Sequence, residues 1–192
     1  GADVLELRGI ERKHLFGHGR AFSLGEVQTK LDTAQGQERP TELAMKIYIG
    51  SDHAGFELKT HLVPFLQKAG HDVLDLGTDS IASVDYPDFA QKVARAVQGD
   101  ATSFGILICG TGIGVSIAAN RFKGIRCAPC QDPAVAQLAR QHNNANILAL
   151  GARLLTSTAQ AEAIVNAFLD TAFEGGRHEP RVIKIDMAGG CG

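Results

Sequence analysis

The sequence has no surplus of basic residues and no long uninterrupted hydrophobic run. Its net charge is -2 at pH 7, so it lacks the basic excess that is typical of nucleic-acid-binding proteins. No apolar stretch reaches the roughly 20 residues that a membrane-spanning helix needs. The longest run, 104–120, is broken by glycines, which favour a buried strand and a turn. We therefore predict neither nucleic acid nor a membrane as a partner.

Cysteine is also scarce, with four residues in the whole chain: Cys109, Cys127, Cys130 and Cys191. Four thiols in a chain of 192 residues do not form a disulfide framework. The first 20 residues are charged and lack the apolar core of a secretory signal. We therefore expect a cytoplasmic protein with free thiols. The Cys127-x-x-Cys130 spacing has no second pair beside it, so neither a metal site nor a redox role is expected there.

The composition changes near residue 44 and divides the chain. Residues 1–44 are polar and too short for a core of their own. We interpret them as an N-terminal extension or an added leader, with a docked native element as the alternative. Within them, a capping box at Ser23–Glu26 predicts a short helix to about Thr33. Residues 45–186 have the length of one α/β domain, and 187–192 are interpreted as a tail.

The second part of the chain alternates between short apolar runs and amphipathic segments. Strand-like runs occupy 46–52, 72–77, 104–110, 125–130 and 146–151. The segments between them have helical periodicity, as has a last segment over 156–173, before a Gly-Gly stop. We predict an α/β fold with a doubly wound five-stranded parallel sheet and helices on both faces. Ligands of such sheets bind beyond the carboxyl ends of the strands.

A glycine-rich turn, CGTGIG at 109–114, follows the third predicted strand. Its successive backbone N–H groups are typical of an anion site. A dinucleotide site needs G-x-G-x-x-G. The first two glycines fit that pattern and Asp132 lies where a ribose-binding acid would follow, but Val115 occupies the third glycine position.

The same turn is also compatible with chemistry at Cys109. The backbone N–H groups can hold an oxyanion that develops during a reaction. A helix N-terminus favours the thiolate form of a neighbouring cysteine. The plain alternative is a small buried cysteine at the end of a strand.

Four further polar residues stand at strand or helix ends. Asp52 and His53 follow the first predicted strand and can exchange protons, although Asp52 there can equally cap the next helix. His142 and Asn143 close the fourth predicted helix, where a C-terminal cap and a turn residue are the plain alternatives.

Arginines follow the last predicted strand and the last predicted helix, at Arg153, Arg177 and Arg181. A guanidinium group recognises phosphate by paired hydrogen bonds. Most surface arginines are nevertheless solvated and bind nothing specific. Spacing alone does not say whether Arg177 and Arg181 serve their own cleft or a neighbouring subunit's.

Five motifs occur in order: SDHAGF (51–56), DYPDFA (85–90), CGTGIGVSIAANRF (109–122), RQHNNANILALGAR (140–153) and EGGRHEPR (174–181). On these motifs the chain, from about Met45 to about Ile185, resembles the type B ribose-5-phosphate isomerases of the ribose/galactose isomerase family. The resemblance implies a flavodoxin-like fold and a homodimer or tetramer with active sites at the subunit interface. It also implies a sugar phosphate substrate and neither a metal nor an organic cofactor.

The reaction that the resemblance implies converts D-ribose 5-phosphate into D-ribulose 5-phosphate through a cis-enediol. Cys109 would move the proton between C2 and C1, a task that relatives with serine at this position give to a glutamate elsewhere. The implied catalytic residues are Cys109, His142, Thr111 and Asp52, with His142 assisting ring opening. The implied substrate-binding residues are His53, Tyr86, Gly110, Gly112, Ile113, Gly114, Asn143, Arg153, Arg177 and Arg181.

Two other functions stay open at this level. Within the family, an isomerase of hexose phosphates, allose 6-phosphate or galactose 6-phosphate, is the alternative, although Cys109 and the arginine set favour a pentose. A nucleotide-binding module would need only the glycine-rich turn.

Overall fold

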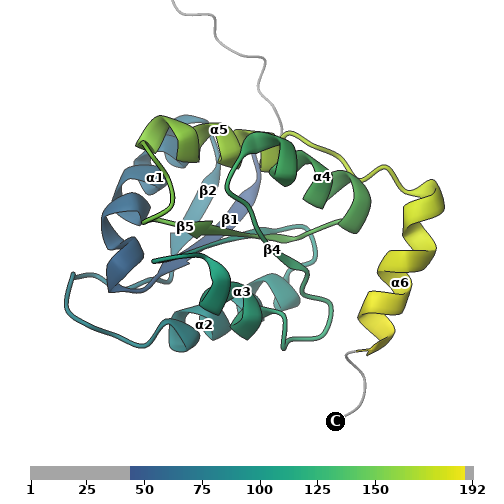
Figure 1. The fold of residues 1–192 in the computed structure, drawn as a ribbon, viewed down its shortest axis with the longest axis horizontal. Helices are drawn as coiled ribbons and strands as arrows, with labels where there is room; N and C mark the ends of the chain where they lie inside the picture. The colour runs from purple at the N-terminus through teal and green to yellow at the C-terminus, as the bar shows by residue number, and fades with distance from the viewer. Residues whose placement is uncertain (1–43, 189–192) are drawn as a thin grey trace, which may run out of the picture. The chain divides into compact units, whose positions relative to one another are not determined.

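The computed structural model describes residues 44–188, which contain a parallel sheet between two layers of helices (Figure 1). Its strands are β1 (Lys46–Ser51), β2 (Asp72–Asp75), β3 (Phe104–Cys109), β4 (Cys127–Pro129) and β5 (Ile147–Gly151). The strand order is β2-β1-β3-β5-β4, which exchanges the last two strands of the flavodoxin order. The predicted doubly wound, flavodoxin-like class is confirmed. The helix predicted at Ser23–Thr33 and Cys191 lie outside the described residues.

The helices divide between the two faces as right-handed crossovers require. Helices α1 (Phe56–Lys68), α4 (Pro133–Asn143) and α5 (Thr158–Leu169) cover one face, and α2 (Tyr86–Gly99) and α3 (Ile113–Ala119) cover the other. The connections from β1 to β2 and from β4 to β5 lead toward the β2 end of the sheet. The connections from β2 to β3 and from β3 to β4 lead toward the β4 end. Crossovers of one hand therefore place α1 and α4 opposite α2 and α3. None of the described helices is long and apolar enough to cross a membrane.

Each face of the sheet has its own apolar core, and β3 contributes to both. Ile106 and Ile108 point into the core beneath α1, α4 and α5. Leu107 and Cys109 point into the core above α2 and α3, because successive strand residues face opposite sides. The side chain of Cys109 is therefore directed toward the α2–α3 layer.

Several elements are shorter than their sequence patterns predict. Helix α3 begins at Ile113 instead of Thr111, because Gly112 has φ 77°, a left-handed conformation outside the helix. Strand β4 is reduced to Cys127–Pro129 at the sheet edge, where a proline, which lacks an N–H, is tolerated. Helix α5 ends at Leu169, before the predicted residue 173.

Helix α6 (Glu179–Ala188), which follows a 3-10 turn η2 (Gly176–His178), was not predicted and runs past the predicted domain end at 186. It lies outside the two helical layers, near the end of α4 (Figure 1). Among its described side chains only Val182 is buried, whereas Ile183, Ile185 and Met187 are exposed. A helix that buries so little has no apolar stripe that a sequence pattern can reveal.

Candidate active site

The carboxyl ends of β1, β3 and β5 are joined by backbone hydrogen bonds. The N–H of Asp52 donates to a β3 carbonyl at 3.3 Å. Ala152 donates to the carbonyl of Cys109 at 2.9 Å, and Arg153 donates to that of Gly110 at 3.0 Å. The helices after β1 and β3 leave toward opposite faces, so a crevice opens between these two strand ends. Chemistry-bearing residues from three strands therefore meet at one edge.

Cys109 ends β3 and is 5% exposed. Its Sγ accepts a hydrogen bond from the N–H of Gly112 at 3.1 Å. Gly112 combines its positive φ with close packing, since a Cβ there would lie 3.1 Å from the carbonyl carbon of Leu150. A Cβ on Gly151 would likewise lie 2.7 Å from the carbonyl of Thr111. Two glycines thus let the turn pack directly on the end of β5 and hold an N–H donor at the sulfur.

The turn continues under the ring of Tyr86, the first residue of α2. A Cβ on Gly114 would lie only 2.7 Å from that ring, so the aromatic side chain rests on the backbone of α3. The Oγ1 of Thr111 accepts from the N–H of Ile113 at 3.4 Å. Tyr86 and Ile113 are 41% and 54% exposed, so the turn has an open side with apolar surroundings.

Asp52 and His53 are both held by backbone groups. The Oδ1 of Asp52 accepts from the N–H groups of Ala54 and Gly55, at 2.9 and 3.1 Å, which caps the 3-10 turn η1 (His53–Gly55). Of the two roles considered for Asp52, capping of the following helical turn is the one seen in the structure. The Nδ1 of His53 accepts from the N–H of Val84 at 3.2 Å, so a neutral His53 carries its proton on Nε2.

An ion pair with one buried partner, not anticipated from the sequence, supports the segment that holds His53. Lys59 on α1 is 3% exposed and pairs with the carboxylate of Asp75 at the end of β2. The other oxygen of Asp75 accepts from the N–H of Gly77 at 2.8 Å. The pair therefore anchors the start of the loop that leads to Val84. Its partners are 16 residues apart and meet only through the fold, so local pattern does not signal them.

Arg153 follows β5 and lies across the backbone of Gly110. A Cβ on that glycine would touch the arginine side chain at 3.4 Å. Arg153 also lines a hollow of about 400 Å³, bounded by the start of α1 and the loop before α5. Ten predicted site residues therefore share the carboxyl edge of the sheet: Asp52, His53, Tyr86, Cys109, Gly110, Thr111, Gly112, Ile113, Gly114 and Arg153.

The other four predicted residues, His142, Asn143, Arg177 and Arg181, do not join them. His142 and Asn143 close α4 just before β5 begins, which is the amino edge of the sheet. The two edges are roughly 15 Å apart, because β5 has five residues at about 3.3 Å each. Asn144, with φ 46°, is the C-cap of α4, so capping does not explain His142.

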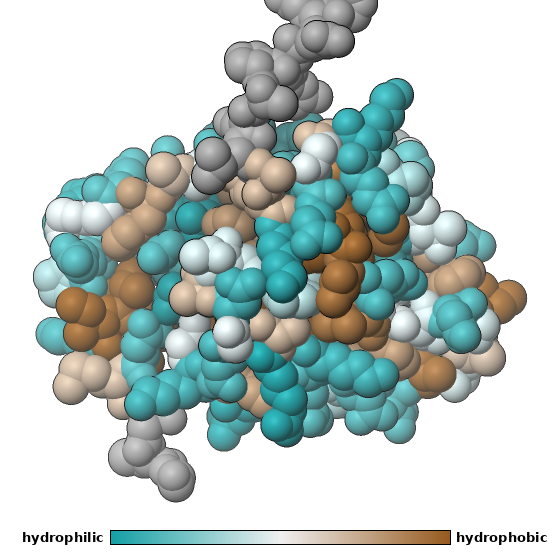
Figure 2. Space-filling model, turned by 180° about the vertical axis from the view of Figure 1, so that it is seen from behind, coloured by the Kyte–Doolittle hydropathy of each residue, from teal (hydrophilic) through white to brown (hydrophobic). Residues whose placement is uncertain are grey.

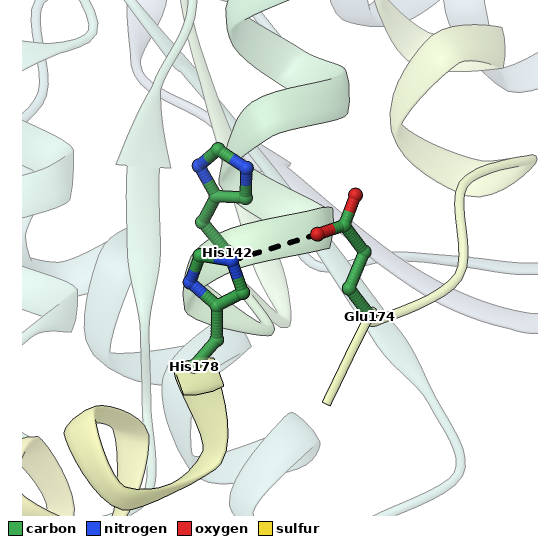
Figure 3. A group of neighbouring side chains, drawn as sticks. All are labelled: His142, Glu174 and His178. Carbon is green, nitrogen blue, oxygen red and sulfur yellow. Dashed lines mark ion pairs between the residues drawn. The ribbon is translucent and has the colours of Figure 1, made fainter. Parts of the chain in front are cut away.

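His142 forms a compact group with Glu174 and His178 (Figure 3). The imidazole rings of His142 and His178 are stacked, with centroids 4.3 Å apart and planes 8° from parallel. Glu174 Oε2 lies 3.5 Å from His178 Nε2, and the Nε of Arg177 donates to the same nitrogen at 3.3 Å. His178 and Glu174 lie within the quoted 174–181 motif, although spacing gave them no role.

This group does not have the geometry of a metal centre. Its three ligand atoms lie within 4.8 Å of one another. A histidine binds a metal through a nitrogen lone pair that lies in the ring plane, and one ion cannot lie in two parallel stacked planes. The site therefore holds a histidine pair, and we assign no metal to it.

Cys127 and Cys130 also lack the arrangement that a metal or redox motif requires. Cys127 points into the α2–α3 core, whereas Cys130 points into the core of the opposite face. Burial raises the pKa of the Cys130 thiol to about 12 and raises that of Cys127 as well. Asp132, the candidate ribose-binding acid, caps α4 by accepting from the N–H of Val135 at 3.0 Å.

The fold and this edge define an open α/β protein with a candidate acid–base site at the switch point of its sheet. Residues 47–185 match the model of the ribose/galactose isomerase family, and the chain belongs to that family. Ribose-5-phosphate isomerase B of Escherichia coli K12 is 51% identical over 140 residues, which cover 73% of this chain and 93% of the relative. The predicted family is confirmed, and the isomerase interpretation is favoured over a nucleotide-binding module.

Solved structures of ribose-5-phosphate isomerases B also match this chain. Ribose-5-phosphate isomerase B of Clostridium thermocellum is 51% identical with a TM-score of 0.73, covering 75% of this chain and 97% of its own. The enzyme of Mycoplasma genitalium with bound ribulose-5-phosphate is 43% identical with a TM-score of 0.73, covering 77% of this chain and 97% of its own.

Proposed function

We propose that this protein is an aldose–ketose isomerase that interconverts D-ribose 5-phosphate and D-ribulose 5-phosphate. The carrying observation is Cys109, buried at the carboxyl edge with its sulfur facing the N–H of Gly112 at 3.1 Å. A base beside a row of backbone N–H donors suits proton transfer next to a carbonyl group. The relatives compared above are ribose-5-phosphate isomerases, which favours a pentose over a hexose substrate.

The thiolate of Cys109 removes the proton from C2 of the open-chain aldose, and the electron pair moves onto the carbonyl oxygen at C1. The resulting cis-enediolate is held by backbone N–H groups of the turn 110–114. The proton then passes from Cys109 to C1 while the hydroxyl proton at C2 moves to the oxygen of C1. A ketone forms at C2. Hydrogen only moves within the substrate, so the overall reaction needs no external oxidant or reductant.

The catalytic edge of one subunit is incomplete for this reaction. The substrate is a closed ring with a phosphate, and the remaining predicted residues for both tasks lie at the opposite edge. In a two-fold dimer, each subunit can present its amino edge to the carboxyl edge of the other. We therefore propose a homodimer, alone or paired into a tetramer, with two active sites at the interface. Ile113 and Ile117 on α3, 54% and 62% exposed beside the turn, support a contact there.

In this arrangement, the partner's His142 donates a proton to the ring oxygen and the bond between that oxygen and C1 breaks. The C1 hydroxyl releases its own proton to solvent, which leaves the open-chain aldehyde. The phosphate is bound by His53 and Arg153 together with the partner's Arg177 and the partner's Arg181. Asp52, Thr111 and Tyr86, with the partner's Asn143, contact the sugar hydroxyls.

We also propose that the enzyme works in the cytoplasm. The three described cysteines are free thiols, which suits a reducing compartment.

A coupled assay comparing ribose 5-phosphate, allose 6-phosphate and galactose 6-phosphate tests the proposed substrate. We expect the highest kcat/KM for ribose 5-phosphate. A higher value for either hexose phosphate would reassign the substrate within the family. Tight dinucleotide binding without isomerase activity would overturn the function itself.

Replacing Arg153 by glutamine tests phosphate binding at the carboxyl edge. We expect the KM for ribose 5-phosphate to rise about 10- to 100-fold, because a charge-assisted hydrogen bond is worth about 1.5–3 kcal/mol. Turnover of unphosphorylated ribose should change little. The control is Arg95→Gln on α2, an exposed arginine over the ring of Phe122, which should leave KM unchanged. Equal losses on both sugars would contradict a phosphate role for Arg153.

A further inference from the structure

The stacked pair of His142 and His178 joins two elements that are distant in the sequence. His142 is in the last turn of α4, and His178 ends η2 just before α6. Their rings lie face to face, with centroids 4.3 Å apart (Figure 3). No feature of the proposed mechanism uses His178 so far. We propose that His178 is a positioning residue that fixes the ring of His142 for opening the sugar ring. This inference rests on the proposed function.

His178 is itself held firmly. It is 4% exposed, and its backbone N–H donates to the carbonyl of Gly175 at 3.0 Å. Its Nε2 accepts the Nε–H of Arg177 at 3.3 Å. The second torsion of a histidine side chain has broad, shallow minima. A fixed parallel ring therefore limits the orientations open to His142.

The protonation state of His178 suits a residue that only packs against His142. Its Nε2 accepts a hydrogen bond, so the proton of the neutral ring is on Nδ1. Burial, then the nearby positive groups of His142, Arg177 and Arg181, hold its pKa below the usual value, and only Glu174 opposes them. These groups therefore favour the neutral form of His178. A neutral ring can lie against a cationic His142, whereas two stacked imidazolium rings would repel each other.

Two variants separate stacking from simple stability. His178→Ala removes the ring, and His178→Phe keeps a flat face without the nitrogens. Each is assayed for net conversion of ribose 5-phosphate, which begins as a closed ring, and for exchange of deuterium from D₂O into C1 of ribulose 5-phosphate. The ketose cannot close a five-membered ring, because its 5-oxygen carries the phosphate. Exchange therefore reports proton transfer at Cys109 without ring opening.

For His178→Ala we expect kcat on ribose 5-phosphate to fall about 10- to 100-fold, the cost of misplacing a catalytic group. KM and deuterium exchange should each stay within about twofold. His178→Phe should recover most of the lost turnover. Thermal melting of both variants shows that the measured protein is folded.

Four results decide the matter. Parallel loss of exchange and conversion in His178→Ala would mean a general structural role and overturn the proposal. Unchanged conversion would overturn it too, and so would a phenylalanine variant as slow as the alanine variant. If the parent protein catalyses neither conversion nor exchange, the proposed function fails, which is a separate and recognisable outcome.

Discussion

Replacing Cys109 by serine is expected to lower kcat for ribose 5-phosphate by about 10²- to 10⁴-fold, the usual cost of losing a general base. Serine is nearly isosteric and can still accept the N–H of Gly112, so folding should be preserved. A hydroxyl is a far weaker acid than a thiol, however, and stays protonated. The segment 110–117 that follows contains no carboxylate to replace it. Deuterium exchange into ribulose 5-phosphate should fall with turnover, since both need the same base.

The matched control for this variant is Cys130→Ala. That thiol is buried in the opposite core, away from the turn. We expect it to lower the melting temperature and leave kcat per folded molecule nearly unchanged. If Cys109→Ser turns over as fast as the parent, Cys109 is not the base, and the carrying observation of the proposed function is lost.

Mixing two inactive variants is expected to restore activity. Cys109→Ser removes the proposed base at the carboxyl edge, and His142→Ala removes the proposed ring-opening group at the amino edge. Each homodimer lacks one of these groups at both sites. In a heterodimer, one site lacks both groups and the other pairs an intact Cys109 with the partner's His142. With random pairing, about a quarter of all sites are therefore complete, and activity should return to about a quarter of the parent's.

The control mixture pairs Cys109→Ser with Asp52→Asn, two changes at the same edge. Every heterodimer site then carries one defect, so mixing should restore nothing. Activities are measured on the random mixture and on affinity-separated heterodimers whose mass confirms one copy of each chain. In the purified heterodimers of the first pair one site of two is complete, so their expected activity is about half of the parent's. Absence of recovery in the first mixture would show that His142 does not act across an interface with Cys109.

Exposed apolar side chains bear on where the proposed interface would form. Figure 2 shows hydrophobic patches among hydrophilic surface, including one on its left side, where α6 lies after the rotation from Figure 1. Ile183 and Met187, one helical turn apart on α6, are 52% and 72% exposed. Helix α6 directly follows the Arg177–His178 segment. A partner subunit that covers α6 would therefore also lie near the group of His142, Glu174 and His178.

Most of the residues at the carboxyl edge could be predicted, because their place there depends only on their following a strand in the sequence. Asp52, Cys109 and Arg153 each follow an apolar run of strand length, and all the strands are parallel. Residues placed after parallel strands meet at one edge whatever the strand order is. The exchange of β4 and β5 in the sheet was not predictable in this way, because pairing is decided between segments far apart in the sequence.

Other features depended on contacts that carry no local pattern. Lys59 and Asp75 pair across two elements, and α6 buries only Val182 of its described side chains. A helix without an apolar stripe has no pattern that predicts it. A lysine in an amphipathic helix has the same local sequence whether or not it forms an ion pair in the folded protein.

By itself, the sequence determined the fold class, the family and the glycine-rich turn with Cys109 at its start. The fold class follows from periodicity, the family from the resemblance carried by five ordered motifs, and the turn from a conformation that favours glycine, at Gly112 with φ 77°. The tertiary structure decided that His142, Arg177 and Arg181 lie at the opposite edge and that His142 stacks on His178. The physical reason is that α4 must run back along the sheet before β5 begins, which places its last turn at the edge opposite the one that holds Cys109.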